Sequence, residues 1–223
     1  TNGGALFLGH FGVGFGAKRL APRTSLGTLF LAAQFIDLLW PSLLLLGLER
    51  VAIVPGITTV TPLDFTHYPW THSLLLVAIW GAAFGAVYYL VKRYRVGAWV
   101  CGAAVISHWV LDLLLHRPDL PILPGGEYRA GFGLWNSLGA TLVIEMAIFG
   151  LGLALYLRTT TAADRIGSIS LWSLVGFLVL VYLGNVFGSP PPSVRAIAWL
   201  GQAQWLLVIW AYWIDRHRMT KEG

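Results

Sequence analysis

Two histidines and an aspartate recur at four-residue spacing near the end of an apolar run, at His108, Asp112 and His116. On an α-helix, residues four apart lie on one face, so the side chains of His108 and Asp112 can reach the same ion. His116 lies about 12 Å along the axis from His108 and shares that ion only if the helix ends early; otherwise it serves a second ion. Pro118 disfavours helix at Arg117 and would permit an early end. The ordinary alternative is a set of polar residues that caps a buried helix.

Other imidazoles and carboxylates lie near earlier apolar stretches, at His10, Asp37, Asp64, His67 and His72. Imidazole and carboxylate together suit Zn²⁺, Mn²⁺ or Fe²⁺ better than copper, which is softer, or calcium, which takes oxygen ligands alone. If these residues meet in the fold, the chemistry they predict is therefore the binding of a divalent transition metal. Zinc is the first choice, with manganese and iron as alternatives.

The elements that must position these residues are strongly apolar. Of 223 residues, 57% are hydrophobic and only 11% are charged, whereas about 25% of an average soluble protein is charged. Apolar runs of about 20 residues recur to the end of the chain, which predicts an all-α, polytopic transmembrane helix bundle that forms one domain over residues 1–223. We expect about seven membrane segments, the first of them short, at approximately 4–17, 25–47, 70–91, 96–116, 133–157, 167–187 and 194–214.

Three features inside these segments predict local structure. The stretch Gly12-Val13-Gly14-Phe15-Gly16 has neither the preceding strand nor the Lys-Ser/Thr pair of a phosphate-binding loop, so its glycines predict close helix packing. Pro41 follows Asp37 by four residues and is expected to kink or end the second segment near that carboxylate. The single cysteine, Cys101, can form no internal disulfide and is expected to pack inside an apolar run.

Lysine and arginine are distributed unequally between the predicted loops. Eleven of the 15 fall on one side of the membrane and four on the other. By the positive-inside rule, the C-terminus lies in the cytoplasm and the N-terminus outside, in a multi-pass protein of the cell (inner) membrane. Because these loop charges account for the net charge of +5, nucleic acid is excluded as a partner. The minority side holds Arg50, Arg117, Arg129 and Arg195.

This topology places five of the six histidines at the outer membrane face, together with carboxylates. The sixth, His217, lies in a basic cytoplasmic tail and is expected to be solvated. Ionisable groups in or near a bilayer are costly and point to function by default. Each group also has an ordinary alternative, such as an Asp37–Arg117 ion pair or a plain loop position for His67 and His72.

Across roughly residues 5–120, the candidate residues form one ordered pattern: His10, Asp37, Asp64-Phe65-Thr66-His67, Thr71-His72-Ser73 and His108-x3-Asp112-x3-His116. This pattern resembles the membrane-bound metal-dependent hydrolases of the YdjM-like type, a family distantly similar to zinc-dependent phospholipase C. The resemblance implies an all-helical fold that holds divalent metal ions and hydrolyses phosphoesters. The metal ligands it implies are His10, Asp37, His67, His108 and Asp112, with His72 and His116 as further candidates.

One departure from that family bears on the number of metal ions. The soluble phospholipases have a later His-x3-Glu pair that completes their metal cluster, whereas this chain has no histidine between residues 116 and 217. Glu145 lies about 18 Å along the fifth predicted segment, which is too deep to replace that pair. The resemblance therefore implies one or two metal ions rather than three.

The remaining polar residues have roles that follow from physical chemistry. A bound zinc ion lowers the pKa of its water to about 7 and so supplies hydroxide at neutral pH. Asp64, or Asp37 if it is not a ligand, is a candidate catalytic base or an orienting partner for a ligating imidazole. Arg117 is a candidate catalytic clamp for a phosphate group, and its alternative is a charge that extends to the membrane interface. A site at headgroup level favours an amphiphilic substrate, such as a phospholipid or a lipid-linked phosphate.

Three other functions stay open at this point. The chain can be a non-catalytic subunit or scaffold of a larger membrane protein complex, in which a metal only joins helices. Haem or chlorophyll ligation by paired histidines is disfavoured by the accompanying carboxylates. A transporter is favoured by polar residues in the membrane but lacks a visible inverted repeat. Membrane lipid is the expected surrounding in every case, and the last three segments are candidates for docking a partner protein.

Overall fold

The structure is a computed structural model that describes residues 8–221. It is 68% helical, and the expected all-α class is confirmed. The helices are α1 (Leu8–Leu20), α2 (Leu26–Ala33), α3 (Phe35–Leu45), α4 (Pro69–His72), α5 (Leu74–Lys92), α6 (Arg95–Leu115), α7 (Leu138–Thr159), α8 (Arg165–Phe187), α9 (Val194–Gln202) and α10 (Gln204–Arg216). The strands are β1 (Arg50–Ile53), β2 (Leu63–His67), β3 (Leu120–Pro121), β4 (Arg129–Ala130), β5 (Thr160–Ala162) and β6 (Arg218–Thr220).

Five helical stretches within the described residues are long and apolar enough to cross a membrane: α5, α6, α7, α8, and α9 with α10 taken together as Val194–Arg216. Helices α2 and α3 together form a sixth candidate span, bent by 55°. Helix α1 has 13 residues and is therefore about 20 Å long, short of the roughly 30 Å of a bilayer core. These helices carry many exposed large apolar side chains, such as Trp99 and Leu180, as lipid contact requires. The fold is that of a multi-pass membrane protein, and the expectation of about seven segments holds approximately.

The bend in the second segment does not lie where Pro41 predicted it. Pro41 sits inside α3, which continues to Leu45, and the break between α2 and α3 falls earlier, at Gln34. The proline ring packs on α9, where a Cβ added at Gly201 would lie 2.4 Å from Pro41 Cγ. Asp37 is therefore in the first turn of α3, just after a change in helix direction.

Helix α1 lies at the centre of the bundle, between α7, α2 and α6. Its apolar residues Leu8, Phe11 and Phe15 are completely buried. Gly12 and Gly152 bring α1 and α7 into backbone contact, since a Cβ at Gly152 would lie 1.9 Å from the carbonyl oxygen of Gly12. The close helix packing predicted for Gly12, Gly14 and Gly16 is confirmed, since an added Cβ would meet α7 at Gly12 and Gly16 and Phe30 of α2 at Gly14.

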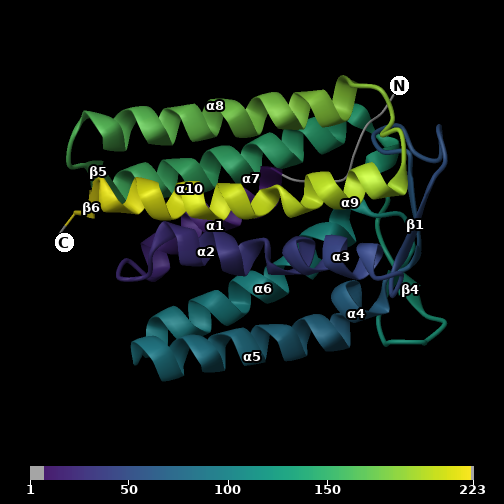
Figure 1. The fold of residues 1–223 in the computed structure, drawn as a ribbon, viewed down its shortest axis with the longest axis horizontal. Helices are drawn as coiled ribbons and strands as arrows, with labels where there is room; N and C mark the ends of the chain where they lie inside the picture. The colour runs from purple at the N-terminus through teal and green to yellow at the C-terminus, as the bar shows by residue number, and fades with distance from the viewer. Residues whose placement is uncertain (1–7, 222–223) are drawn as a thin grey trace.

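Three short antiparallel strand pairs mark the two ends of the bundle (Figure 1). β5 pairs with β6 at one end, while the β1–β2 and β3–β4 hairpins lie at the other. The loops that carry eleven of the 15 basic residues meet at the β5–β6 end. There Lys18 and Asp215 tie α1 to α10, with 3.4 Å between Nζ and Oδ1. Helix α4, with His72, lies at the opposite end.

We expect Gly152→Ala to lower the free energy of unfolding by about 1–3 kcal/mol, because the new methyl group would force α1 away from α7. Gly150→Ala is the matched control on the same helix, where an added Cβ meets nothing within 4 Å. Thermal unfolding of the detergent-purified variants measures the difference. Equal melting temperatures for the two variants would contradict this account of the α1–α7 contact.

Candidate metal centre

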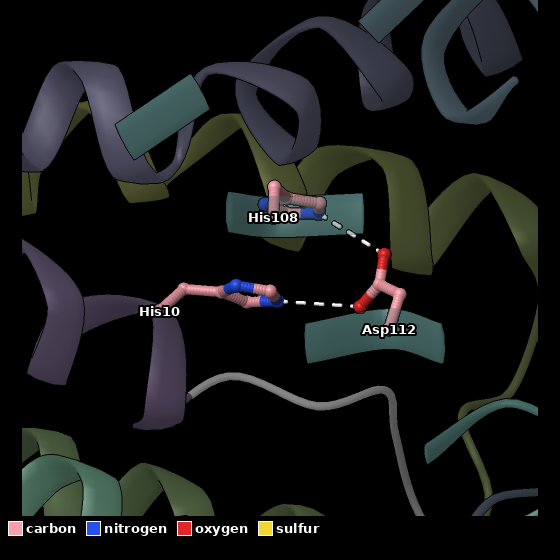
Figure 2. A group of neighbouring side chains, drawn as sticks. All are labelled: His10, His108 and Asp112. Atoms are coloured by element: carbon pink, nitrogen blue, oxygen red, sulfur yellow. Dashed lines mark ion pairs between the residues drawn. The ribbon is translucent and has the colours of Figure 1, made fainter. Parts of the chain in front are cut away.

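Five side chains from four helices converge in the interior, and we call them the His/Asp cluster: His10 from α1, Asp37 from α3, His72 from α4, and His108 and Asp112 from α6. Figure 2 shows three of them, with the imidazoles of His10 and His108 both directed at the carboxylate of Asp112. The i, i+4 spacing of His108 and Asp112 on α6 brings their side chains together, as the sequence predicted.

The donor atoms of the cluster form two overlapping groups of three, His10 with His108 and Asp112, and Asp37 with His72 and His108, each within 4.8 Å of one another. His10 Nε2 is 3.3 Å from Asp112 Oδ1, and His108 Nε2 is 3.4 Å from Asp112 Oδ2 and 3.5 Å from Asp37 Oδ1. His72 Nε2 is 3.7 Å from an oxygen of each aspartate. Ligand atoms about 2.1 Å from a tetrahedral zinc ion are about 3.4 Å apart. The shorter donor separations in the cluster lie close to this value, so the cluster could hold a divalent metal ion.

Several of these atoms lack hydrogen-bond partners although they are buried. Both ring nitrogens of His10, Nε2 of His108 and Oδ2 of Asp112 are in this condition. A buried polar atom without a partner costs about 1–3 kcal/mol. A shared cation would satisfy Nε2 of His10, Nε2 of His108 and the Asp112 oxygen at once, so these residues fit a metal ion, while Nδ1 of His10 would stay without a partner.

No lysine or arginine within residues 8–221 forms an ion pair with Asp37 or Asp112. Their ion-pair partners are the three imidazoles of the cluster. Buried carboxylates are normally paired with a cation or coordinate a metal. The two negative charges of the cluster equal the charge of one divalent ion.

His108 is held in a fixed orientation by the broken second segment. Its Nδ1 lies 3.2 Å from the carbonyl oxygen of Ala33, the last residue of α2, and donates a hydrogen bond to it. The ring also stacks on His10, with 3.8 Å between ring centroids and 4° between planes. Since Nδ1 carries the proton, Nε2 presents its lone pair to the carboxylates.

His116 does not join the cluster. Helix α6 runs to Leu115, so His116 lies two turns beyond His108, at the helix C-cap. Its Nδ1 is 2.9 Å from Asp119 Oδ1, and its ring packs on Trp135 with 4.1 Å between centroids. The helix does not end early enough for His116 to share the ion, and this imidazole has a carboxylate partner of its own.

The structure also places three other predicted site residues apart from the cluster. His67 lies on the exposed side of β2, opposite Arg50 in the hairpin, and belongs to neither group of converging ligand atoms. The two predicted catalytic residues, Asp64 and Arg117, form an ion pair with each other. Arg117 Nε also donates to Asp119 Oδ2 at 3.1 Å. The guanidinium is thus engaged by two carboxylates instead of standing free for a phosphate.

Two buried glutamates have contacts that the sequence did not predict: Glu145, which was predicted to lie too deep for the site, and Glu49, for which no role was predicted. Glu145 lies seven residues after the start of α7 at Leu138, about 10 Å along the helix instead of the expected 18 Å, because α7 begins later than the predicted segment. Its Oε2 accepts a hydrogen bond of 2.7 Å from the backbone N–H of Gly9, so it holds the start of α1 next to His10. The other glutamate, Glu49, contacts the residue before His72. No spacing pattern marked either residue.

A polar network surrounds His116 at the end of α6. Burial opposes ionisation of Asp119, but hydrogen bonds from His116, Arg117 and Tyr68 outweigh it, and the pKa of this carboxyl lies below its usual 3.8. Burial, together with the neighbouring Asp119 charge, raises the pKa of the Tyr68 hydroxyl well above its usual value. The ionised Asp119 therefore stabilises the loop that follows α6.

We expect Asp119→Asn to lower the free energy of unfolding at pH 7 by about 2 kcal/mol, through loss of charged hydrogen bonds. A depressed pKa in the folded state means that this stabilisation is present above the unfolded value near 3.8 and is lost as the pH falls through the folded value. The difference between wild type and variant should therefore be full at pH 7 and shrink below about pH 4. Unfolding measured across this range in detergent checks it, and a difference that grows on acidification would contradict it.

Comparisons with known proteins identify no relative of this chain. No protein-family model matches the chain, and neither a curated protein nor a solved structure matches it. The likeness to YdjM-like hydrolases thus rests on the residue pattern alone. The features that bear on the function of the chain are the His/Asp cluster and the helix bundle that holds it.

Proposed function

We propose that this chain is an integral membrane metalloprotein that holds one divalent transition metal ion, preferably zinc, at the His/Asp cluster and hydrolyses a phosphoester. The observation that carries the proposal is the convergence of three imidazoles and two carboxylates from four helices at donor distances of 3.3–3.7 Å. One ion is proposed because the two overlapping ligand groups share His108, and a single nitrogen lone pair serves one metal.

The hydrolytic part of the proposal rests on access to the cluster. The Asp37 side chain is 16% exposed, whereas those of the other four residues are at most 4% exposed. Water and substrate would therefore approach past Asp37, at the bend between α2 and α3. A zinc ion at this position would supply hydroxide at neutral pH. The resemblance to YdjM-like hydrolases supports a phosphoester as the substrate class.

The position of the cluster supports an amphiphilic substrate. The basic loops gather at the β5–β6 end of the bundle, which by the positive-inside rule would face the cytoplasm of a cell (inner) membrane. His72 and α4 lie towards the other end. A phospholipid or a lipid-linked phosphate in the outer leaflet would reach this end directly. This orientation puts the C-terminus inside and the start of α1 towards the outside.

A second candidate function is a metal that only joins helices in a non-catalytic membrane subunit. The near-complete burial of His10, His72, His108 and Asp112 favours it, since closed sites leave no coordination position for water. The two functions differ at Asp37. A coordination position on the metal ion that is left open beside Asp37 permits hydrolysis, whereas ligation of the ion by all five residues does not.

We expect detergent-purified protein to contain close to one zinc, manganese or iron ion per chain, measured by mass spectrometry of the metals. His108→Ala and Asp112→Ala should each lower the metal content by at least about tenfold, because each removes a donor from the shared position. His67→Ala is the matched control, since it removes an exposed imidazole outside the cluster. Metal-free wild type, or equal metal loss in His67→Ala, would contradict the proposed site.

We expect the wild-type protein to hydrolyse a chromogenic phosphodiester or a short-chain phospholipid in mixed micelles. A chelator should abolish hydrolysis and Zn²⁺ should restore it, while His108→Ala should be inactive under all conditions. The joining function has a different signature: chelation lowers the melting temperature, and no phosphoester is hydrolysed at any metal concentration. That second result would sink the hydrolase proposal and leave the metal site standing.

A further inference from the structure

A chain of buried hydrogen bonds lies behind His72. The Thr71 hydroxyl is 2.7 Å from His72 Nδ1 and donates to Glu49 Oε2, also at 2.7 Å. The backbone N–H of Thr71 donates to the other carboxylate oxygen, Oε1, at 2.9 Å. Glu49 is 1% exposed and Thr71 is completely buried. Every atom in this chain is therefore shielded from water, and its partners are other atoms of the protein.

The direction of these hydrogen bonds determines the tautomer of His72. An ionised carboxylate only accepts hydrogen bonds, so the single hydroxyl proton of Thr71 points to Glu49. The hydroxyl oxygen then accepts a hydrogen bond from His72, which places the imidazole proton on Nδ1. The lone pair of Nε2 is left facing the oxygens of Asp37 and Asp112, each 3.7 Å away. This is the tautomer that ligates a metal through Nε2.

We propose that Glu49 and Thr71 are positioning residues that hold His72 in the tautomer and orientation needed to bind the metal ion. This inference rests on the proposed metal site and assigns to it a supporting residue pair. Partners of this kind orient a ligating imidazole and increase its basicity, and their loss typically lowers metal affinity 10–100-fold.

Helix α4 needs such an anchor because it has only four residues. A helix of this length has no stability of its own. Glu49 reaches it from the loop after α3, 22 residues earlier in the chain, and α3 also carries Asp37. The carboxylate thereby ties the His72 ligand to the element that supplies the Asp37 ligand. His108 has the corresponding support from the carbonyl oxygen of Ala33.

A simpler role for Glu49 is to accept the backbone N–H of Thr71 and stabilise α4 alone. Thr71→Val separates the two roles, because it removes the hydroxyl and keeps both the backbone N–H and the side-chain shape. Thr71→Ser is the matched control that retains the hydroxyl. Glu49→Gln is the second variant: the two Thr71 donors reach different carboxylate oxygens, and one of these becomes an NH2 donor in glutamine, so a side chain in the same place loses one of the two hydrogen bonds.

The experiment uses the full-length protein in detergent and measures Zn²⁺ affinity by competition with a chromogenic chelator. Thr71→Val and Glu49→Gln should bind Zn²⁺ about 10–100-fold more weakly than wild type, and Thr71→Ser should bind it within about threefold, since its hydroxyl makes the same bonds. The visible spectrum of the Co²⁺-loaded protein is a second measurement, and it should change in Thr71→Val and be retained in Thr71→Ser. The unfolding of the metal-free proteins shows how much α4 itself is affected.

The outcomes separate this inference from the metal site on which it rests. Wild-type protein that binds no Zn²⁺ or Co²⁺ overturns both. Wild type that binds Zn²⁺, with equal affinity in folded Thr71→Val or Glu49→Gln, overturns the positioning role and leaves the metal site intact. Failure of both variants to fold, with normal folding and binding of Thr71→Ser, identifies Glu49 and Thr71 as a structural anchor and also overturns the positioning role.

Discussion

The structure depends on two carboxylates, Asp37 and Asp112, that lie inside an apolar helix bundle without a lysine or arginine partner among the described residues. Removing an ionised carboxylate from water costs several kcal/mol even after the protein relaxes. Three imidazoles surround the pair, so its charge is balanced either by protonated imidazoles or by a bound cation. The proposed divalent metal ion would supply two positive charges at this position.

The bundle meets this constraint by bringing short elements into contact with long ones. The described part of helix α1, Leu8–Leu20, is shorter than a bilayer core, and backbone contact at Gly12 and Gly152 holds it against α7. Glu145 accepts a hydrogen bond from Gly9, one residue before His10. The four-residue α4 is anchored in a similar way by Glu49. His10 and His72 are thus positioned by buried carboxylates on neighbouring elements.

The polar residues at the end of α6 show the contrast with the cluster. His116, Arg117 and Asp119 satisfy one another, and Asp64 pairs with Arg117. Positive and negative groups are both present there, so the network is complete within the protein. The His/Asp cluster has carboxylates and imidazoles but no permanent cation. This difference in charge balance, rather than the presence of histidine, distinguishes the candidate metal site from the structural network.

Much of the fold and part of the site could be predicted from local sequence. Long apolar runs require helices in a membrane, and six of the predicted segments, those over 25–47, 70–91, 96–116, 133–157, 167–187 and 194–214, contain helices or helix pairs. The first reaches outside the described residues, and its remainder lies in α1. His108 and Asp112 belong together because helix geometry alone puts residues four apart on one face. By the same geometry, His116 shares an ion with His108 only if the helix ends early and otherwise serves a second ion; α6 runs to Leu115, and His116 lies apart from the cluster with Asp119 as its partner.

Only the tertiary structure decided which distant residues complete the site. His67 and His72 are five residues apart, but one is exposed on a strand and the other is buried at the end of α4. The burial of His72 depends on the contact of Glu49 with Thr71 and on the approach of α3. These contacts join residues far apart in the chain and leave no periodic pattern. The pairing of Asp64 with Arg117 and the late start of α7 were hidden for the same reason. Local spacing determines which face a side chain takes on its own helix, whereas the packing of separate helices determines what that face meets.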